Sequence, residues 1–310
     1  MFNVRKSMSG RNYSPGVLIG NWNEDVYLEE ELLKDFLHKR ERGELLIQKS
    51  QRLKENLYKK EQLSISKDGF VHFGDTVLLV NPDDNSISST EKDPTARGDL
   101  SLAVNPEEEE VHRSQKLVAP CGVSAIRSVM PIGRNTFKIL SIEGEEMGDP
   151  VRFGQNFGLG AMGGFPDQML YLMSDHKTFM NMTKKSHTQS AFMTDELTYL
   201  ASWQAIFLDP QFRLEYEGFP VPANTKMLIV HSYTNQGLAI HRDFYIRTNF
   251  GKEYEVNCHT YLDTHKAEKD MNHWVIVTGN PSSNATTMFD RPKPPSEETR
   301  IQNAEFQEAT

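Results

Sequence analysis

The spacing of hydrophobic residues changes along this chain. Leu28, Leu32 and Phe36 recur at every fourth position, which predicts an amphipathic helix that ends near Gly43. A second helix is predicted from residue 44 to about residue 60, again with leucines along one stripe. We expect both helices to lie on a partner or against the rest of the protein, because isolated helices of this length are marginal in water.

From residue 63 the hydrophobic period becomes two, and turn residues separate short apolar runs. Many short strands of this kind are typical of a mainly β sandwich, barrel or trefoil-like body. The predicted strands cover residues 70–73, 76–80, 100–104, 135–140, 151–159, 169–173, 203–207, 212–216, 226–231, 244–247, 253–261 and 273–277. We expect the first two to pair around the turn at residues 74–75.

One short sequence motif, here called the repeated phrase, occurs twice. Residues 71–75 read VHFGD, and residues 151–155 read VRFGQ. Residues 227–246 follow a similar course without the Phe-Gly pair. Such repetition indicates a scaffold built from like units, and it favours a trefoil-like closure over a two-sheet sandwich.

These patterns predict three regions. Residues 1–62 form an N-terminal extension with one or two amphipathic helices, and residues 63–280 form the β-rich body. The body divides into blocks at about 63–132, 133–196 and 197–280. Residues 281–310 are rich in Pro, Ser, Thr and Glu, and we expect an extended or disordered tail.

Composition narrows the possible functions. The chain has 310 residues, 37% of them hydrophobic, a mean hydropathy of −0.57 and a net charge of −9. This charge argues against nucleic acid as a partner, because phosphate binding requires an excess of Lys and Arg. Two cysteines cannot form a disulfide framework, and no apolar run predicts a signal peptide or a membrane span. We therefore expect a soluble intracellular protein.

Three patterns suggest a cofactor site, a metal site or a catalytic nucleophile, and each has a simpler interpretation. Residues 158–163 spell G-x-G-x-x-G, but no helix is predicted after them, so a turn between strands is favoured over a dinucleotide site. Cys258 and His259 suggest zinc, yet neighbours on a strand point to opposite faces, so surface and edge histidines, His231 among them, are favoured. Cys121 follows a proline in a predicted exposed loop, without a nucleophile motif. We predict no catalytic residue, cofactor or metal.

Residues 39–60 contain eight basic and three acidic residues, a local net charge of +5 in an acidic protein. This region is either a solvated helix face or a docking helix for an acidic surface such as tubulin. Its charges could also pair with the acidic residues of the preceding helix. For the docking interpretation, Lys49, Arg52 and Lys54 are candidate contact residues.

Long stretches of the chain resemble the family of cilia- and flagella-associated protein 161. The stretches are PGVLIGNWNEDVYLEEELLKDFL (15–37), FGDTVLLVNPD (73–83), RGDLSL (97–102), PIGRNTFKIL (131–140), RLEYEGFPVPANTK (213–226), HWVIVTGN (273–280) and RPKPPSEETR (291–300). The first dozen residues and the acidic insert at 105–116 fit the family least well, so no function is transferred to them.

The resemblance implies a structural microtubule inner protein, not an enzyme. Such proteins bind the luminal wall of the A-tubule in ciliary doublet microtubules and stabilise the axoneme for motility. The implied partners are α- and β-tubulin and other microtubule inner proteins, including EF-hand-containing and sperm-associated antigen proteins, with no nucleic acid and no membrane. The resemblance also implies a body similar to MIR-type trefoil modules.

Besides the structural role, two hypotheses remain open: a carbohydrate-binding module and a nucleotide-binding enzyme. In the structural role, a hot spot is expected at a helix residue such as Leu32 or Phe36, or at the loop aromatic Trp22. A carbohydrate-binding trefoil would instead use Trp203 or Trp274 as a stacking surface. An enzyme would bind a nucleotide at the glycine-rich segment.

Overall fold

The computed structural model describes residues 22–83, 98–107, 110–111, 114, 116–165, 168–179, 181–280 and 283–287. The side chains of residues 22, 23 and 283–287 are outside this description. The first 21 residues, residues 108–109, 112–113 and 115 of the acidic insert, and residues 281–282 and 288–310 of the predicted tail lie outside the described residues.

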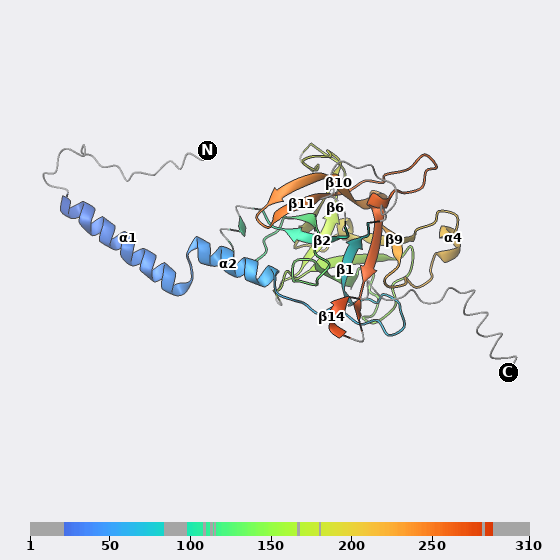
Figure 1. The fold of residues 1–310 in the computed structure, drawn as a ribbon, viewed down its shortest axis with the longest axis horizontal. Coiled ribbons are helices and arrows are strands. Elements are labelled where there is room, and N and C mark those ends of the chain that lie inside the picture. The colour runs from blue at the N-terminus through green and yellow to red at the C-terminus, as the bar shows by residue number, and fades with distance from the viewer. Residues whose placement is uncertain are drawn as a thin grey trace.

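The described chain is a mainly β body with helices at its N-terminal side, as expected (Figure 1). The helices are α1 (Trp22–Arg42), α2 (Leu46–Leu57) and the short α4 (Arg213–Tyr216). The strands are β1 (Thr76–Asn81), β2 (Leu100–Asn105), β3 (Cys121–Ile126), β4 (Thr136–Ser141), β5 (Asn156–Ala161), β6 (Leu170–Ser174), β7 (Gln189–Thr194), β8 (Trp203–Phe207), β9 (Lys226–His231), β10 (Gln236–Thr248), β11 (Gly251–Cys258), β12 (His273–Val277), β13 (Gly279–Asn280) and β14 (Ser283–Thr287).

Six strands close into a circuit of antiparallel pairs. The pairs are β1–β12, β12–β9, β9–β8, β8–β5, β5–β4 and β4–β1. Three further antiparallel pairs, β2–β3, β6–β7 and β10–β11, attach to this circuit. They also pair with one another through β3–β7, β7–β11 and β11–β3. Closure of this kind leaves few unpaired strand edges.

The repeated phrase joins the parts of the body by a ring of backbone hydrogen bonds. Val71 N–H donates to Val221 O at 3.0 Å, Val221 N–H to Val151 O at 2.7 Å, and Val151 N–H to Val71 O at 2.8 Å. The expected pairing of residues 70–73 with β1 is therefore wrong, because these residues pair with segments far away in sequence. The third copy is residues 221–225 and not the expected stretch from Met227.

The fourth residue of each copy has a left-handed backbone. Its φ is +95° at Gly74, +79° at Gly154 and +60° at Asn224. Glycine and asparagine are the residues that tolerate this conformation best. The third copy reads VPANT and lacks the Phe-Gly pair, yet it makes the same turn because the ring uses backbone atoms only.

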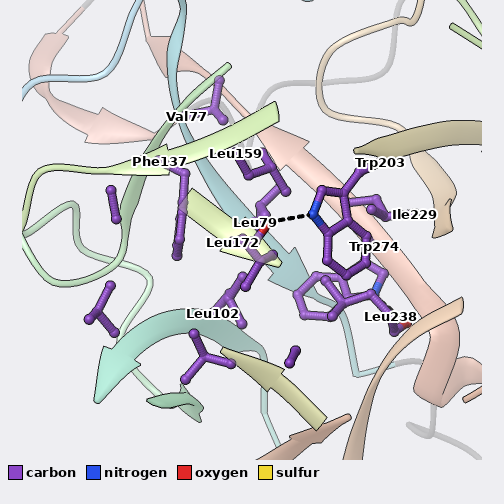
Figure 2. Close-up of a cluster of buried hydrophobic side chains, with 14 of the residues drawn as sticks. Val77, Leu79, Leu102, Phe137, Leu159, Leu172, Trp203, Ile229, Leu238 and Trp274 are labelled. Atoms are coloured by element: carbon purple, nitrogen blue, oxygen red, sulfur yellow. Dashed lines mark hydrogen bonds between the residues drawn. The ribbon is translucent and has the colours of Figure 1, made fainter. Parts of the chain in front are cut away.

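Both tryptophans of the body are buried in the core (Figure 2). The indole N–H of Trp203 donates to Leu172 O at 2.8 Å, and that of Trp274 donates to Leu238 O at 2.8 Å. A buried indole N–H requires such a partner. Neither ring can stack on a sugar from solvent, so the proposed carbohydrate-stacking role of these two tryptophans is wrong.

Three elements, α4, β3 and β7, differ from the expectation. Residues 212–216 were predicted as a strand, but they form α4, because Glu215 and Tyr216 N–H both donate to Phe212 O at 3.0 Å. The predicted exposed loop at Cys121 is the buried strand β3. Strand β7 lacks the apolar alternation on which strand prediction depends, whereas β3 has it at Cys121, Val123 and Ala125 and was missed all the same.

Candidate interaction site on the N-terminal helices

Helix α1 leaves the body and exposes its apolar stripe. Leu32 is 61% exposed and Phe36 46% exposed, and Leu28 on the same stripe is also exposed. Figure 1 shows α1 extending beyond α2, away from the strands. The expected amphipathic helix is present, and its apolar face is not covered by the described part of the body.

Charge placement supports α1 without help from the body. Lys34 pairs with Glu30 at 2.8 Å and Lys39 pairs with Asp35 at 2.7 Å, both four residues apart. Such pairs stabilise a helix by about 0.2–0.5 kcal/mol each. The first turn is acidic and the last turn is basic, which complements the helix dipole. Two acidic residues of α1, Glu30 and Asp35, thus pair within their own helix.

Gly43 ends α1 and permits the change of direction toward α2. It has a φ of +72°, its N–H donates to Arg40 O at 3.2 Å, and Glu44 N–H donates to Lys39 O at 2.8 Å. This is the Schellman arrangement of a helix C-terminus. The predicted stop near Gly43 is confirmed.

A glutamine ties the two helices together across this turn. Gln48 Nε2 donates to Arg40 O at 3.0 Å, and Gln48 Oε1 accepts the N–H of Leu45 at 3.3 Å. One side chain therefore gives the Arg40 carbonyl, at the end of α1, a second donor beside Gly43 N–H, and it satisfies a free N–H at the start of α2.

Helix α2, in contrast, is part of the core. Leu53 and Leu57 are buried and belong to the same apolar cluster as Leu117 and Phe165. Burying a leucine side chain contributes about 1.5–3 kcal/mol. The contact is close enough to require glycine: a Cβ on Gly164 would lie 2.3 Å from the carbonyl oxygen of Asn56.

That contact explains why glycines are needed at the end of the glycine-rich segment. Gly158 and Gly160 lie within β5, and Gly163 and Gly164 form the turn against which α2 packs. A Cβ on Gly163 would lie 2.3 Å from a methyl group of Leu117. The predicted turn therefore covers only the end of the motif, and its function is helix packing.

An aromatic ring connects α2 to a buried ion pair. Phe250 lies 5.8 Å from the Tyr58 ring, edge-on, and Lys54 Nζ lies 6.0 Å from its centroid. The guanidinium of Arg134 lies over the Phe250 ring, 3.9 Å from its centroid. Arg134 then bonds Glu253 through both guanidinium ends, at 2.6 and 2.8 Å.

The Arg134–Glu253 pair is buried and fully bonded. Arg134 Nε donates to Val104 O at 2.7 Å, and Ser124 Oγ donates to Glu253 Oε2 at 2.6 Å. A bidentate pair with these additional bonds offsets much of the cost of burying two charges. Sequence analysis missed this cluster, because its members come from distant segments and no spacing relates them.

The three basic candidates have different environments. Lys54 lies over Phe250, whereas Lys49 is half-buried and Arg52 is exposed. The guanidinium of Arg52 lies over Gly43, where a Cβ would come within 2.2 Å of it. Arg52 and Lys116 also line a hollow of about 230 Å³ beside Phe165. Trp22 begins α1, but its side chain lies outside the described residues.

The two cysteine thiols are poorly suited to act as nucleophiles. Burial raises the pKa of both the Cys121 and the Cys258 thiols to about 12, so neither is a thiolate at neutral pH. His231 is buried, not at the surface as expected, and this burial lowers its pKa. Within the described residues, no three His, Cys, Asp or Glu side chains are arranged as a metal site, and no helix there is long and apolar enough to cross a membrane.

Comparison with known proteins identifies the family. The family model of the cilia- and flagella-associated protein 161-like domain matches residues 49–279. The chain belongs to this family. Cilia- and flagella-associated protein 161 of Bos taurus is 54% identical over 303 residues, which cover 98% of this chain and 94% of the relative. The Mus musculus protein of the same name is 54% identical over 295 residues, 94% of this chain and 97% of the relative.

The resemblance found in the sequence is thus confirmed, and association with cilia and flagella follows from the family. The names of these relatives refer to no reaction. The matched domain begins inside α2 and leaves α1 outside it. Among solved structures, the SDF2-like protein of Arabidopsis thaliana is similar at a TM-score of 0.46 with 14% identity, covering 67% of this chain and 94% of that one.

Proposed function

We propose that this protein is a structural microtubule inner protein that binds the luminal wall of the A-tubule in ciliary doublets and stabilises the axoneme for motility. Its proposed partners are α/β-tubulin and neighbouring inner proteins of the EF-hand-containing and sperm-associated antigen classes. Membership of a cilia- and flagella-associated family supports the location.

The observation that carries this proposal is the uncovered apolar stripe of α1. A helix whose leucine and phenylalanine side chains face solvent gains stability when a partner covers them. The stripe includes Leu32 and Phe36, and Trp22 begins the same face, since fourteen residues correspond to about four turns. We propose Trp22, Leu32 and Phe36 as the apolar part of the interface.

Basic side chains beyond the C-terminal end of this stripe favour an acidic partner at that end. The last turn of α1 carries Lys39, Arg40 and Arg42, and α2 adds Lys49 and Arg52. At the proposed location, the luminal wall of the A-tubule, tubulin would be this acidic partner. Lys54 is the weakest candidate of the basic set, because it already contacts Phe250.

For the body, we propose a trefoil-like, MIR-similar scaffold of three blocks. The six-strand circuit, the three attached strand pairs and the ring formed by Val71, Val151 and Val221 support three related units. Its role is to hold interaction surfaces at fixed positions, so that several weak contacts add together.

The test replaces single side chains of α1 in ciliated cells. Phe36→Ala and Trp22→Ala are expected to lower retention in detergent-extracted axonemes without changing the melting temperature, since Phe36 is exposed and α1 extends away from the strands (Figure 1). Tyr27→Ala is the matched control, because Tyr27 is exposed on the same helix but lies nine residues, or about two and a half turns, before Phe36 and faces the other way. Equal retention of all three variants would contradict the α1 interface, and absence of the wild-type protein from the A-tubule lumen in cryo-EM maps would contradict the proposed location.

A further inference from the structure

A second exposed apolar surface lies on the body, far from α1. Residues 209–219 contain α4, and we call them the α4 ledge. Leu214 is 83% exposed and Phe219 58% exposed, and Phe212 is also exposed. Figure 1 places α4 and α1 at opposite ends of the molecule. Large apolar side chains gathered in one segment are typical of interaction sites.

The ledge is held firmly in place. The Tyr216 ring stacks on Phe207, with centroids 4.0 Å apart and planes 3° apart. Arg213 donates through Nε to Phe207 O at 3.0 Å and through Nη2 to Glu268 Oε2 at 2.6 Å. The exposed side chains are therefore displayed on a fixed support, which lowers the entropy cost of binding.

The charges around the ledge are mostly negative. Asp209, Glu215 and Glu217 carry exposed carboxylates within the segment. The ledge's own arginine, Arg213, is matched by Glu268. Arg152 is the cation at the edge, where its Nη1 donates to Gly218 O at 2.8 Å. The ledge therefore presents apolar side chains inside a rim with a net negative charge.

We propose that the α4 ledge is a docking surface for a second protein partner, one that offers an apolar groove or helix face flanked by lysine and arginine. This proposal rests on the proposed function and deepens it. An acidic surface of the kind that suits the basic end of α1 would be repelled here. The two ends of the molecule thus fit partners of opposite charge, and the protein bridges them.

The first test changes the ledge while sparing the fold. Leu214→Ala removes the most exposed apolar side chain, and the double variant Glu215→Lys/Glu217→Lys reverses the rim charge. The matched controls are Met147→Ala, at a residue 64% exposed elsewhere on the body, and Glu146→Lys, also exposed. Each protein is expressed in ciliated cells, and its retention in extracted axonemes is followed through a series of salt concentrations.

Loss of a hot-spot side chain weakens binding by about tenfold or more. Both ledge variants are expected to leave the axoneme at lower salt than the wild type, while both controls behave like the wild type. Unchanged melting temperatures confirm that folding is intact. Retention of both ledge variants at wild-type level across the series would overturn the docking surface. Failure of the wild type itself to be retained would instead contradict the proposed function.

The second test identifies the chemistry of the partner. A photoreactive benzoylphenylalanine at position 214 is irradiated in isolated cilia, and the cross-linked peptide is identified by mass spectrometry, with the same residue at position 147 as control. A cross-linked segment with an excess of Lys and Arg supports the proposal. A segment with net negative charge, or no product at position 214 from a retained protein, overturns it.

Discussion

The two N-terminal helices have similar sequence patterns and different structural roles. Both carry leucines on one stripe, and α1 is the longer, with 21 residues against 12 in α2. Yet α2 buries Leu53 and Leu57 in the core, and α1 leaves Leu32 and Phe36 in solvent. An amphipathic pattern therefore predicts that a helix has a face to cover, but not which surface covers it.

The two helices also depend on different sources of stability. Helix α2 gains from burial and from its link to Arg134 through Phe250. Helix α1 gains from capping at Gly43 and from charge pairs along its own surface. We interpret α2 as the anchor of the N-terminal region and α1 as the segment available to a partner.

The largest expected effect comes from removing the support beneath α2. Arg134→Ala leaves Glu253 buried without its partner, which should lower the free energy of unfolding by about 3–5 kcal/mol. Urea denaturation measures this change. Replacing both Arg134 and Glu253 by Met serves as the control, and it should cost less, because no charge then remains buried. Equal losses would show that packing, not the unpaired charge, dominates.

Replacing comparable leucines of the two helices by alanine should lower the free energy of unfolding by very different amounts. Leu57→Ala creates a cavity in the core and is expected to cost about 2–5 kcal/mol in denaturant unfolding. Leu32→Ala in α1 should change stability by less than about 0.5 kcal/mol, because the side chain is already exposed. Similar values for both would mean that α1 packs on the body in solution.

The close approach of α2 can be tested with glycines of similar backbone conformation. Gly164 has a φ of +79° and Gly218 a φ of +82°, so alanine pays a similar conformational cost at either site, about 1 kcal/mol. Only at Gly164 does the new methyl group also meet the carbonyl of Asn56, while Gly218 faces open space. Gly164→Ala should therefore be the more destabilising by about 1–3 kcal/mol in thermal unfolding. No difference between them would argue against the docked position of α2.

The smallest expected effect concerns α1 as a whole. Deletion of residues 1–42 should change the free energy of unfolding by less than about 0.5 kcal/mol, since Leu28, Leu32 and Phe36 of α1 are all exposed. The same deletion should abolish the axonemal retention assigned to α1. A marked fall in the melting temperature of the truncated protein would instead assign α1 a structural role.

Much of the secondary structure could be predicted from the sequence. The two helices, the stop at Gly43, and strands such as β1, β2, β4 and β6 follow from local spacing and turn residues. Strand β7 was missed because its apolar residues, Ala191 to Met193, are consecutive and not alternating. Strand β3 was missed although Cys121, Val123 and Ala125 alternate with small residues, because a run this short is hard to tell from a loop. The α4 segment was mistaken for a strand because alternation over five residues also fits a short helical turn.

The sequence by itself determined the two N-terminal helices, many of the strands and the family, because side-chain period, caps and long stretches of characteristic sequence are properties of the chain order. Only the tertiary structure decided that residues 221–225 complete the ring begun by Val71 and Val151, since that ring is made of backbone groups that most sequences can supply. It also decided that α2 packs into the core, whereas the described part of the body leaves the apolar stripe of α1 uncovered. That difference depends on whether a complementary surface such as Gly164 lies opposite the stripe, and a one-dimensional pattern contains no such information.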